Sequence, residues 1–338
     1  MVSAVTAYVT FTVFSQMSVG ALIAMVIADF LAKSKEDAKF FETGAWVCVP
    51  VAVIGLIGIL SHEARPIQAM FTMINNVGSS LLSQEVLALT VFVILAVVYT
   101  AMWLLDPEYG SLKWFPVIPS IVGKLAVLRK PVGVLAALVG LAFPYVSAAA
   151  YLLPTLPSLN HPTTILFFYV TALLGGVTAV AAVLSLKYTM KKEGDEPLAR
   201  MLWITMGISL VMVIVLAVGL FANTGMLEAA AETEVAQVAQ EETLRGMLSG
   251  EYATLYMARW VVGVGLAFIC AIALALPLTK KNMAMASMIA IVLFVFVLIG
   301  EIMGRTVLFG TNVPVGELLR DQLASVSALQ TFYTGVGL

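Results

Sequence analysis

The chain alternates long apolar runs with short polar connections along nearly its whole length. Each apolar run has about twenty residues or more, which is the length an α-helix needs to cross the hydrocarbon core of a bilayer. Within lipid, only helices satisfy their own backbone hydrogen bonds at these lengths. The pattern therefore predicts one all-α transmembrane domain over residues 1–338, an eight-helix bundle with spans at roughly 5–32, 42–61, 84–105, 131–153, 163–186, 198–222, 254–278 and 283–309.

Two further segments depart from this pattern. Residues 112–128 are apolar, but Pro116, Pro119 and Lys124 interrupt them, which favours an interfacial segment over a ninth span. The connection 223–253 is rich in Ala, Glu and Gln, and this composition favours a helix outside the membrane. Such a helix could be a solvated surface or a docking surface for another subunit.

Composition supports the membrane class and narrows the chemistry. The chain is 61% hydrophobic with a mean hydropathy of +1.01, and its net charge of −2 and lack of a basic block give no reason to expect nucleic acid. Cys48 and Cys270 fall inside apolar runs without C-x-x-C spacing, so they are read as buried apolar residues. His62 and His161 are too few to ligate two haems on both axial sides. We expect a protein with no haem and no redox metal of its own, although the number of histidines does not by itself exclude a single haem with His/Met ligation.

The distribution of Lys and Arg predicts the orientation. The connections after the first, third, fifth and seventh spans hold 13 of these residues, and the opposite side holds 5. By the positive-inside rule, both termini and the connections after the even-numbered spans face the outer side.

An unusual concentration of polar residues follows the second span, on the predicted outer side. It comprises His62, Glu63, Arg65, Gln68, Asn75 and Asn76. Ser83 and Glu85 then open the third span, where a Ser cap and the helix dipole would account for Glu85 in purely structural terms. These effects do not account for the preceding residues, several of which must lie at headgroup depth or below, where unsatisfied polar groups are costly.

Ionisable residues also occur within the spans. Glu301 and Arg305 are four residues apart in the eighth span, so they share one helix face and can pair. Such residues are functional candidates, yet a pair that only ties helices together is an equal alternative. Asp29 is expected to reach the interface, and Arg259, at the start of the seventh span, to extend its side chain outward.

One chemical interpretation unites these residues. A pocket with titratable groups that opens toward lipid suits an amphipathic ring whose two oxygens exchange protons and whose tail stays in the membrane. His62 and Glu85 are candidate proton acceptors, and the description fits a quinol. The predicted substrate-binding residues are Arg65, Gln68, Asn75, Asn76, Ser83, Glu301 and Arg305.

Four stretches resemble the membrane anchor subunit of dimethyl sulfoxide (DMSO) reductase. They are YVTFTVFSQMSVGALIAM at 8–25, HEARPIQAM at 62–70, NNVGSSLLSQEVLA at 75–88 and GEIMGRTVLFG at 300–310, in the family's order and spacing. In that family the histidine after the second helix and the glutamate opening the third are tied to the quinol site, and these match His62 and Glu85. Gln68 and Asn76 stand where the family commonly has basic residues, which leaves the quinone preference open.

The resemblance implies a haem-free anchor in the prokaryotic inner membrane, which oxidises menaquinol. Its partners would be a four-cluster iron–sulfur subunit and a molybdopterin catalytic subunit on the outer, periplasmic side. Three alternatives stay open. One is a quinone-linked anchor of the polysulfide or nitrite reductase type, working in either direction. The others are a structural anchor whose polar loop only binds partners, and a secondary transporter or channel with an outer gate.

Overall fold

The computed structural model describes residues 3–61 and 65–320, and His62 and Glu63 lie outside this part. The described part is helical, and it contains eight helices long and apolar enough to cross a membrane, as the hydropathy pattern predicts. They run over Ala4–Leu31, Lys35–Leu60, Leu81–Leu104, Ala126–Ala149, Pro162–Lys191, Asp195–Glu228, Ala253–Thr279 and Met283–Arg320.

Several spans are built from more than one helix. The α-helices are α1 (Ala4–Leu31), α2 (Lys35–Phe41), α3 (Ala45–Leu60), α4 (Pro66–Asn75), α5 (Leu81–Leu104), α6 (Ile118–Lys124), α7 (Arg129–Ala149), α8 (Pro162–Val170), α9 (Gly176–Lys191), α10 (Asp195–Glu228), α11 (Glu234–Leu248), α12 (Ala253–Ala258), α13 (Ala267–Ala273), α14 (Ala275–Thr279) and α15 (Met283–Gly310). The short 3₁₀ segments η1 (Glu42–Gly44) and η2 (Ala126–Leu128) precede α3 and α7. Two π-helical segments, η3 (Thr171–Gly175) and η4 (Arg259–Leu266), interrupt the fifth and seventh spans.

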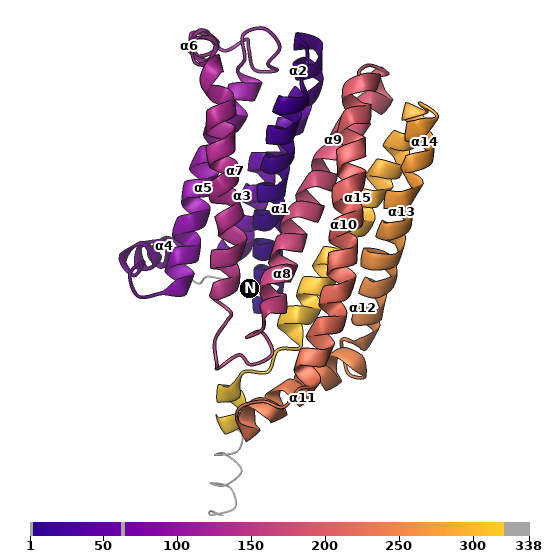
Figure 1. The fold of residues 1–338 in the computed structure, drawn as a ribbon. Coiled ribbons are helices and arrows are strands. Elements are labelled where there is room, and N and C mark those ends of the chain that lie inside the picture. The colour runs from indigo at the N-terminus through magenta and orange to yellow at the C-terminus, as the bar shows by residue number, and fades with distance from the viewer. Residues whose placement is uncertain (1–2, 62–64, 321–338) are drawn as a thin grey trace, which may run out of the picture.

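The spans lie side by side along one axis, with α6 at one end of the bundle and α11 at the other (Figure 1). In the most apolar windows of α1 and of the α8–α9 span, 83% and 78% of residues are buried, against 33–44% in the other six spans. These two helices therefore form the centre of the bundle. The other six spans expose apolar faces, which is the pattern expected of helices that contact lipid.

Glycines allow the closest helix contacts at the centre. A Cβ atom on Gly20 of α1 would overlap the carbonyl oxygen of Ala172 in η3, and one on Gly300 of α15 would overlap Gly263 in η4. Small residues at a crossing let helix backbones approach closely, and close packing is a main source of helix association in membranes. Both π-helical segments are thereby held against neighbouring spans.

The connections match the sequence prediction in part. Residues 112–128 contain α6 and η2 and do not span the bundle, and the 223–253 connection contains the predicted helix, α11, of 15 residues. The sixth span is longer than predicted, because α10 continues to Glu228 with Asn223 and Leu227 buried. The polar connection after the second span contains a helix, α4, that hydropathy did not indicate.

Candidate functional site

Glu85 lies deeper in its helix than the sequence suggested. The cap of α5 is Ser80, whose Oγ accepts a hydrogen bond from the backbone N–H of Ser83 at 3.3 Å. The prediction that Ser83 caps this helix was therefore wrong, since the first helical residue is Leu81. Glu85 consequently falls beyond the first turn, and the cap-and-dipole explanation for it does not hold.

The Glu85 carboxyl group is fully buried between two spans. Its Oε1 accepts a hydrogen bond from the hydroxyl of Ser147 on α7, and its Oε2 has no hydrogen-bond partner among the described residues. Burying a carboxyl group with an oxygen left unpaired is costly unless something else satisfies it. This arrangement suits a group that exchanges a proton or a hydrogen bond with a bound molecule.

A second buried polar cluster joins α15 to α1 and η3. Arg305 donates from Nη2 to Gln16 Oε1 at 2.7 Å and to Thr171 Oγ1 at 3.0 Å, and Thr171 Oγ1 lies 2.5 Å from Glu301 Oε2. The guanidinium also covers the ring of Phe168, 3.8 Å from its centroid. Thus Glu301 and Arg305 share a helix face as predicted, but in the described structure Thr171 links them in place of a direct ion pair.

Arg259 does not extend outward, contrary to the sequence expectation. It is 5% exposed, its guanidinium lies 5.1 Å from the centroid of Phe167, and its Nε has no partner among the described residues. Gly304 makes this possible, because a Cβ there would overlap the guanidinium. The result is a buried set of two arginines and one glutamate, with Glu301 electrostatically coupled to both.

Tyr151 lies between the two polar clusters. Its ring centroid is 5.8 Å from that of Phe168 and 5.2 Å from that of Phe309, and its hydroxyl is electrostatically coupled to Glu85 and Arg305. Tyr151 follows the end of α7, and its burial raises the pKa of the phenol well above its usual value. The hydroxyl therefore stays protonated and can act as a donor.

The polar residues of α4 and its connections lie on the surface, whereas Ser83 is buried. Arg65, Gln68, Asn75 and Asn76 are exposed. Arg65 lies 3.4 Å from Gln68 through Nη1 and Oε1, and Asn76 Nδ2 donates to the carbonyl oxygen of Thr72 at 2.7 Å. His62, the other predicted proton acceptor, lies outside the described residues. The structure thus brings Ser83, Glu85, Glu301 and Arg305 into the interior and leaves Arg65, Gln68, Asn75 and Asn76 at the surface.

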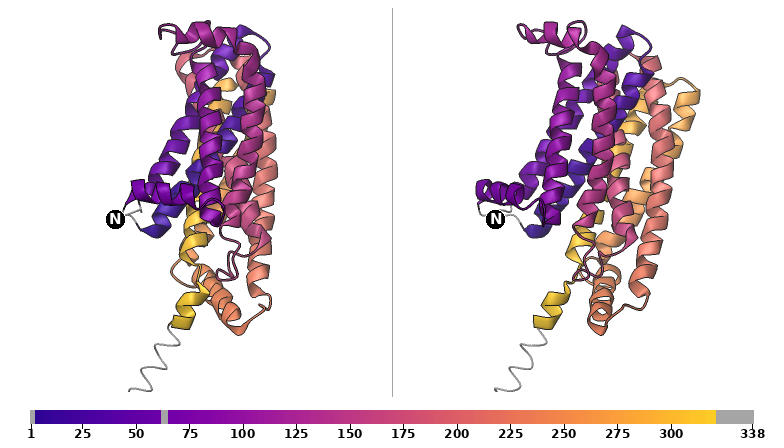
Figure 2. Two further views of the ribbon diagram at one scale, coloured as in Figure 1. Left: turned by 90° about the vertical axis from the view of Figure 1, so that its left-hand side faces the viewer. Right: turned by 60° about the vertical axis from the view of Figure 1, so that its left-hand side comes forward.

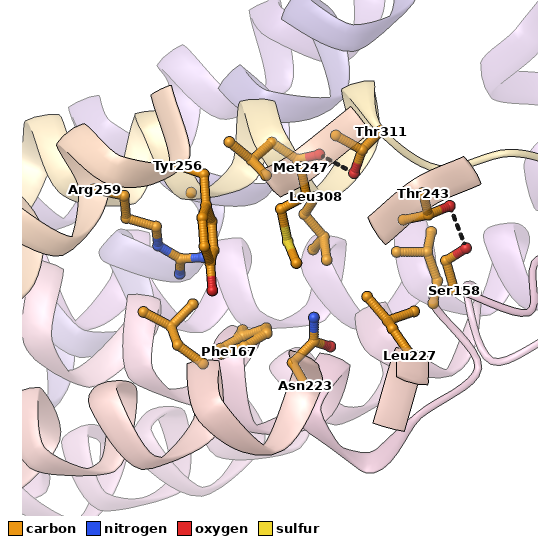
Figure 3. A pocket seen from close by; sticks show the side chains of 14 residues that line it. Ser158, Phe167, Asn223, Leu227, Thr243, Met247, Tyr256, Arg259, Leu308 and Thr311 are labelled. Atoms are coloured by element: carbon orange, nitrogen blue, oxygen red, sulfur yellow. Dashed lines mark hydrogen bonds between the residues drawn. The ribbon is translucent and has the colours of Figure 1, made fainter. Parts of the chain in front are cut away.

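A small cavity adjoins Arg259 and is lined in part by Thr243 and Met247 of α11 (Figure 3). Ser158 and Thr243 hydroxyls lie 2.6 Å apart at one side, and Thr163 donates to Asn223 Oδ1 at 2.8 Å at another. The cavity volume is about 20 Å³, which is room for about one water molecule. The cavity is thus too small to take an aromatic ring as it stands.

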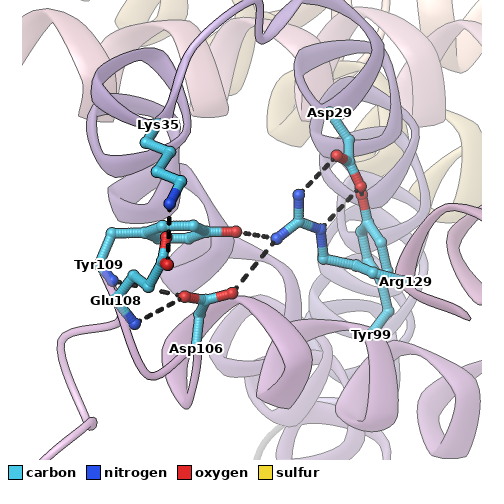
Figure 4. A network of polar contacts seen from close by, with 7 residues as sticks. All are labelled: Asp29, Lys35, Tyr99, Asp106, Glu108, Tyr109 and Arg129. Atoms are coloured by element: carbon cyan, nitrogen blue, oxygen red, sulfur yellow. Dashed lines mark hydrogen bonds and ion pairs between the residues drawn. The ribbon is translucent and has the colours of Figure 1, made fainter. Parts of the chain in front are cut away.

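A separate polar network ties the other end of the bundle together (Figure 4). Arg129 of α7 pairs with Asp29 of α1 through Nη2 and Oδ1 at 2.8 Å, and its Nη1 lies 3.9 Å from Asp106. Its guanidinium also donates to the Tyr109 hydroxyl and lies 4.2 Å from the centroid of Trp103. Asp29 is 1% exposed and is paired with Arg129 at this end of the bundle.

Four residues of the two interior clusters were not predicted from the sequence: Ser147, Tyr151, Gln16 and Thr171. Gln16 and Thr171 carried a weak signal, since polar side chains within apolar spans are candidates for function. Ser147 and Tyr151 carried no signal of this kind, because Ser is common in membrane helices and Tyr is common at their ends.

Eight apolar spans around a buried polar site define a multi-pass helical membrane protein. Comparison with protein families gives a more specific class: residues 4–311 match the model of the DMSO reductase anchor subunit (DmsC). The protein belongs to this family. It is therefore the membrane anchor of a DMSO reductase complex, an oxidoreductase whose catalytic and electron-transfer subunits are its partners.

Individual relatives agree with this assignment. The sequence is 32% identical to that of an anaerobic dimethyl sulfoxide reductase protein of Haemophilus influenzae, over 52% of this chain and 57% of that protein. It is 26% identical to YnfH, an anaerobic dimethyl sulfoxide reductase protein of Escherichia coli K12, over 91% of this chain and 95% of that protein. It is 24% identical to a second anaerobic dimethyl sulfoxide reductase protein of Escherichia coli K12, over 90% of this chain and 94% of that protein.

Proposed function

We propose that this anchor oxidises menaquinol at Glu85 and passes the electrons to an iron–sulfur partner subunit on the outer face. The observation that carries the proposal is the buried carboxyl group of Glu85, held by Ser147 at one oxygen and without a described partner at the other. A positioned carboxylate can take a proton from a ring hydroxyl as the ring is oxidised. Family membership favours this function over the transporter alternative.

The donors around Arg305 would serve the second ring oxygen. Arg305 Nε and Nη1 are buried without partners among the described residues, and the Tyr151 hydroxyl stays protonated between Arg305 and Glu85. These groups can donate to a quinone oxygen once the ring has lost its protons. His62 keeps its proposed role as a second proton acceptor. The surface residues Arg65, Gln68, Asn75 and Asn76 would bind the quinol where it enters the site from the membrane.

The reaction balances with one external acceptor. Menaquinol loses two protons and two electrons to become menaquinone; the protons leave through Glu85 and a second acceptor, and the electrons go to an iron–sulfur cluster of the partner. The molybdopterin subunit would then use them for reduction of the terminal substrate. No haem is required in the anchor if the partner binds close to the oxidation site.

The distribution of charge supports the proposed orientation. The lysine-rich connections lie at the end of the bundle that carries α2 and α6, and Glu85 lies in the other half, near the start of α5 (Figure 1). By the positive-inside rule this second end faces outward, with both termini. Protons and electrons would both leave outward, so quinol-driven proteoliposomes should develop no membrane potential. A potential proportional to turnover would contradict this orientation or direction.

Replacement of Glu85 tests the central assignment. In the purified complex, Glu85→Gln should lower quinol oxidation by about 100-fold or more, because general acid–base catalysis typically contributes that much. Thr90→Val is the matched control on the same helix, since the Thr90 hydroxyl donates to the carbonyl oxygen of Val86 and has no other partner among the described residues. Co-purification of the partner subunits verifies assembly. Full quinol oxidation by an assembled Glu85→Gln complex would overturn the proposal.

A further inference from the structure

Helix α4 presents three distinct faces. Its apolar residues Ile67, Phe71 and Ile74 are 72%, 64% and 62% exposed. At 3.6 residues per turn, these three side chains fall within about 60° of one another around the helix axis. The polar residues Gln68, Thr72 and Asn75 project about a quarter turn away, whereas the half-buried residues Ala69 and Met73 project on the side that remains.

This helix lies across the bundle and touches little of it. Both views in Figure 2 show α4 projecting sideways from the starting end of α5, and α5 is its main neighbour. The exposed face of α4 therefore does not complete the core of the protein. Its direction, roughly perpendicular to the spans, is parallel to the plane of a membrane that the spans cross.

The apolar face of α4 continues the lipid-facing surface of the bundle. Ile54 and Ile57 of α3, and Leu81, Leu82 and Leu87 of α5, are exposed on the two spans that α4 connects. Exposed apolar side chains on a membrane span contact lipid chains. A helix with a separate apolar face and polar face, set beside such a surface, has the form of a helix that lies in the membrane interface.

We propose that α4 is an in-plane interfacial helix whose face of Ile67, Phe71 and Ile74 lies among the lipid acyl chains. Gln68, Thr72 and Asn75 then face the headgroups and water. The occupant of this surface is the lipid leaflet, because the face adjoins surfaces of α3 and α5 that lipid already covers. That the leaflet is the outer one rests on the proposed orientation, but the lipid contact itself does not.

The position of α4 bears on the depth of the candidate site. The helix ends at Asn75, and α5 starts at Leu81, four residues before Glu85. An α4 held in the interface would fix how deep Glu85 lies, and would border the path by which a ring carried in the lipid reaches it. This consequence rests on the proposed function.

Spin-label accessibility tests the proposal in the assembled complex. In liposomes, with Cys48→Ala and Cys270→Ala as background, a nitroxide is attached to Phe71→Cys or to its neighbour Thr72→Cys. Oxygen concentrates among acyl chains, whereas a water-soluble nickel chelate does not enter them. The label at position 71 should collide more with oxygen and the label at position 72 more with the chelate. Ile67→Cys and Gln68→Cys form a second matched pair that should repeat the contrast.

Two results would overturn the proposal. A label at positions 67 and 71 shielded from both reagents would mean that a protein subunit covers this face. Equal chelate access at positions 71 and 72 would mean that the face lies in water. Because no turnover is measured, the test is independent of quinol oxidation, and complexes carrying Glu85→Gln should give the same accessibilities.

Discussion

The hydroxyl of Ser147 on α7 donates a hydrogen bond to Oε1 of Glu85 on α5, in a part of the bundle from which solvent is excluded. The two residues are 62 positions apart in the sequence. Because Oε2 has no other described partner, this one bond fixes the direction of the carboxyl group. The geometry of the candidate site therefore depends on the packing of α5 against α7.

Removal of the Ser147 hydroxyl should impair the site without abolishing it. A hydrogen bond to a charged group contributes about 1.5–3 kcal/mol, so Ser147→Ala should lower the kcat/KM for quinol by about 10- to 100-fold. The control is Ser209→Ala on α10, which removes a buried hydroxyl that has no partner among the described residues. Equal activities for the two variants in steady-state quinol oxidation would count against the role of Ser147.

Thr171 should contribute to stability through its side-chain contacts with Glu301 and Arg305. Thr171→Val keeps the shape of the side chain but leaves both buried partners less satisfied, which should cost about 1–3 kcal/mol of unfolding free energy. Thr178→Val in the same span is the control, because among the described residues the Thr178 hydroxyl bonds only to the backbone carbonyls of Leu174 and Gly175. Thermal unfolding of the two variants in detergent compares them. Identical midpoints would show that the Thr171 link is unimportant.

Arg129 should be structural and unrelated to quinol chemistry. Arg129→Ala leaves Asp29 buried without its cation, which should destabilise the protein by about 3–5 kcal/mol. The exposed pair Lys35 and Glu108 provides the control, since Lys35→Ala should cause no measurable change in stability. Denaturant unfolding measures the loss of stability. A raised KM for quinol in a folded Arg129→Ala complex would contradict this assignment, because it would connect Arg129 with the quinol site at the other end of the bundle.

His161 should make the α11 region sensitive to acid. Its Nε2 lies 3.3 Å from Gln240 Nε2 on α11, and burial lowers the pKa of the imidazole below its usual value near 6.5. Below pH 6.5 the unfolded segment binds a proton that the folded one does not, so this contribution to stability is present above pH 6.5 and is lost as the pH falls.

Hydrogen exchange can measure this effect. Amides of α11 should lose protection between pH 7.5 and 5.5, after correction for intrinsic exchange rates, and His161→Gln should weaken the dependence. Unchanged protection of the wild-type helix over this range would show that His161 does not hold α11.

The sequence predicted the spans well because length and hydropathy determine them directly. Glu301 and Arg305 were found for a related reason, since charges within apolar runs are conspicuous. The π-helical segments were not predictable, because hydropathy does not sense a change in backbone hydrogen bonding. Thr171 in η3 meets Arg305 across 134 positions of the sequence. Such contacts arise only when distant spans pack, and one sequence does not reveal them.

Helix α4 shows a different limit. Its polar residues predict substrate-binding side chains, and the spacing of its apolar residues carries a second, independent signal. Ile67, Phe71 and Ile74 at intervals of four and three would have indicated an amphipathic helix. The polar residues of this segment thus lie on an exposed helix, whereas Glu85 lies in the interior.

Photolabelling of the intact complex with an azide derivative of menaquinone tests most directly whether the ring binds at Glu85. Label should be recovered on the peptides that carry Glu85 and residues 147–151, and an excess of menaquinol should displace it. Label recovered instead around Asp29 and Arg129, or label that menaquinol does not displace, would contradict oxidation at Glu85.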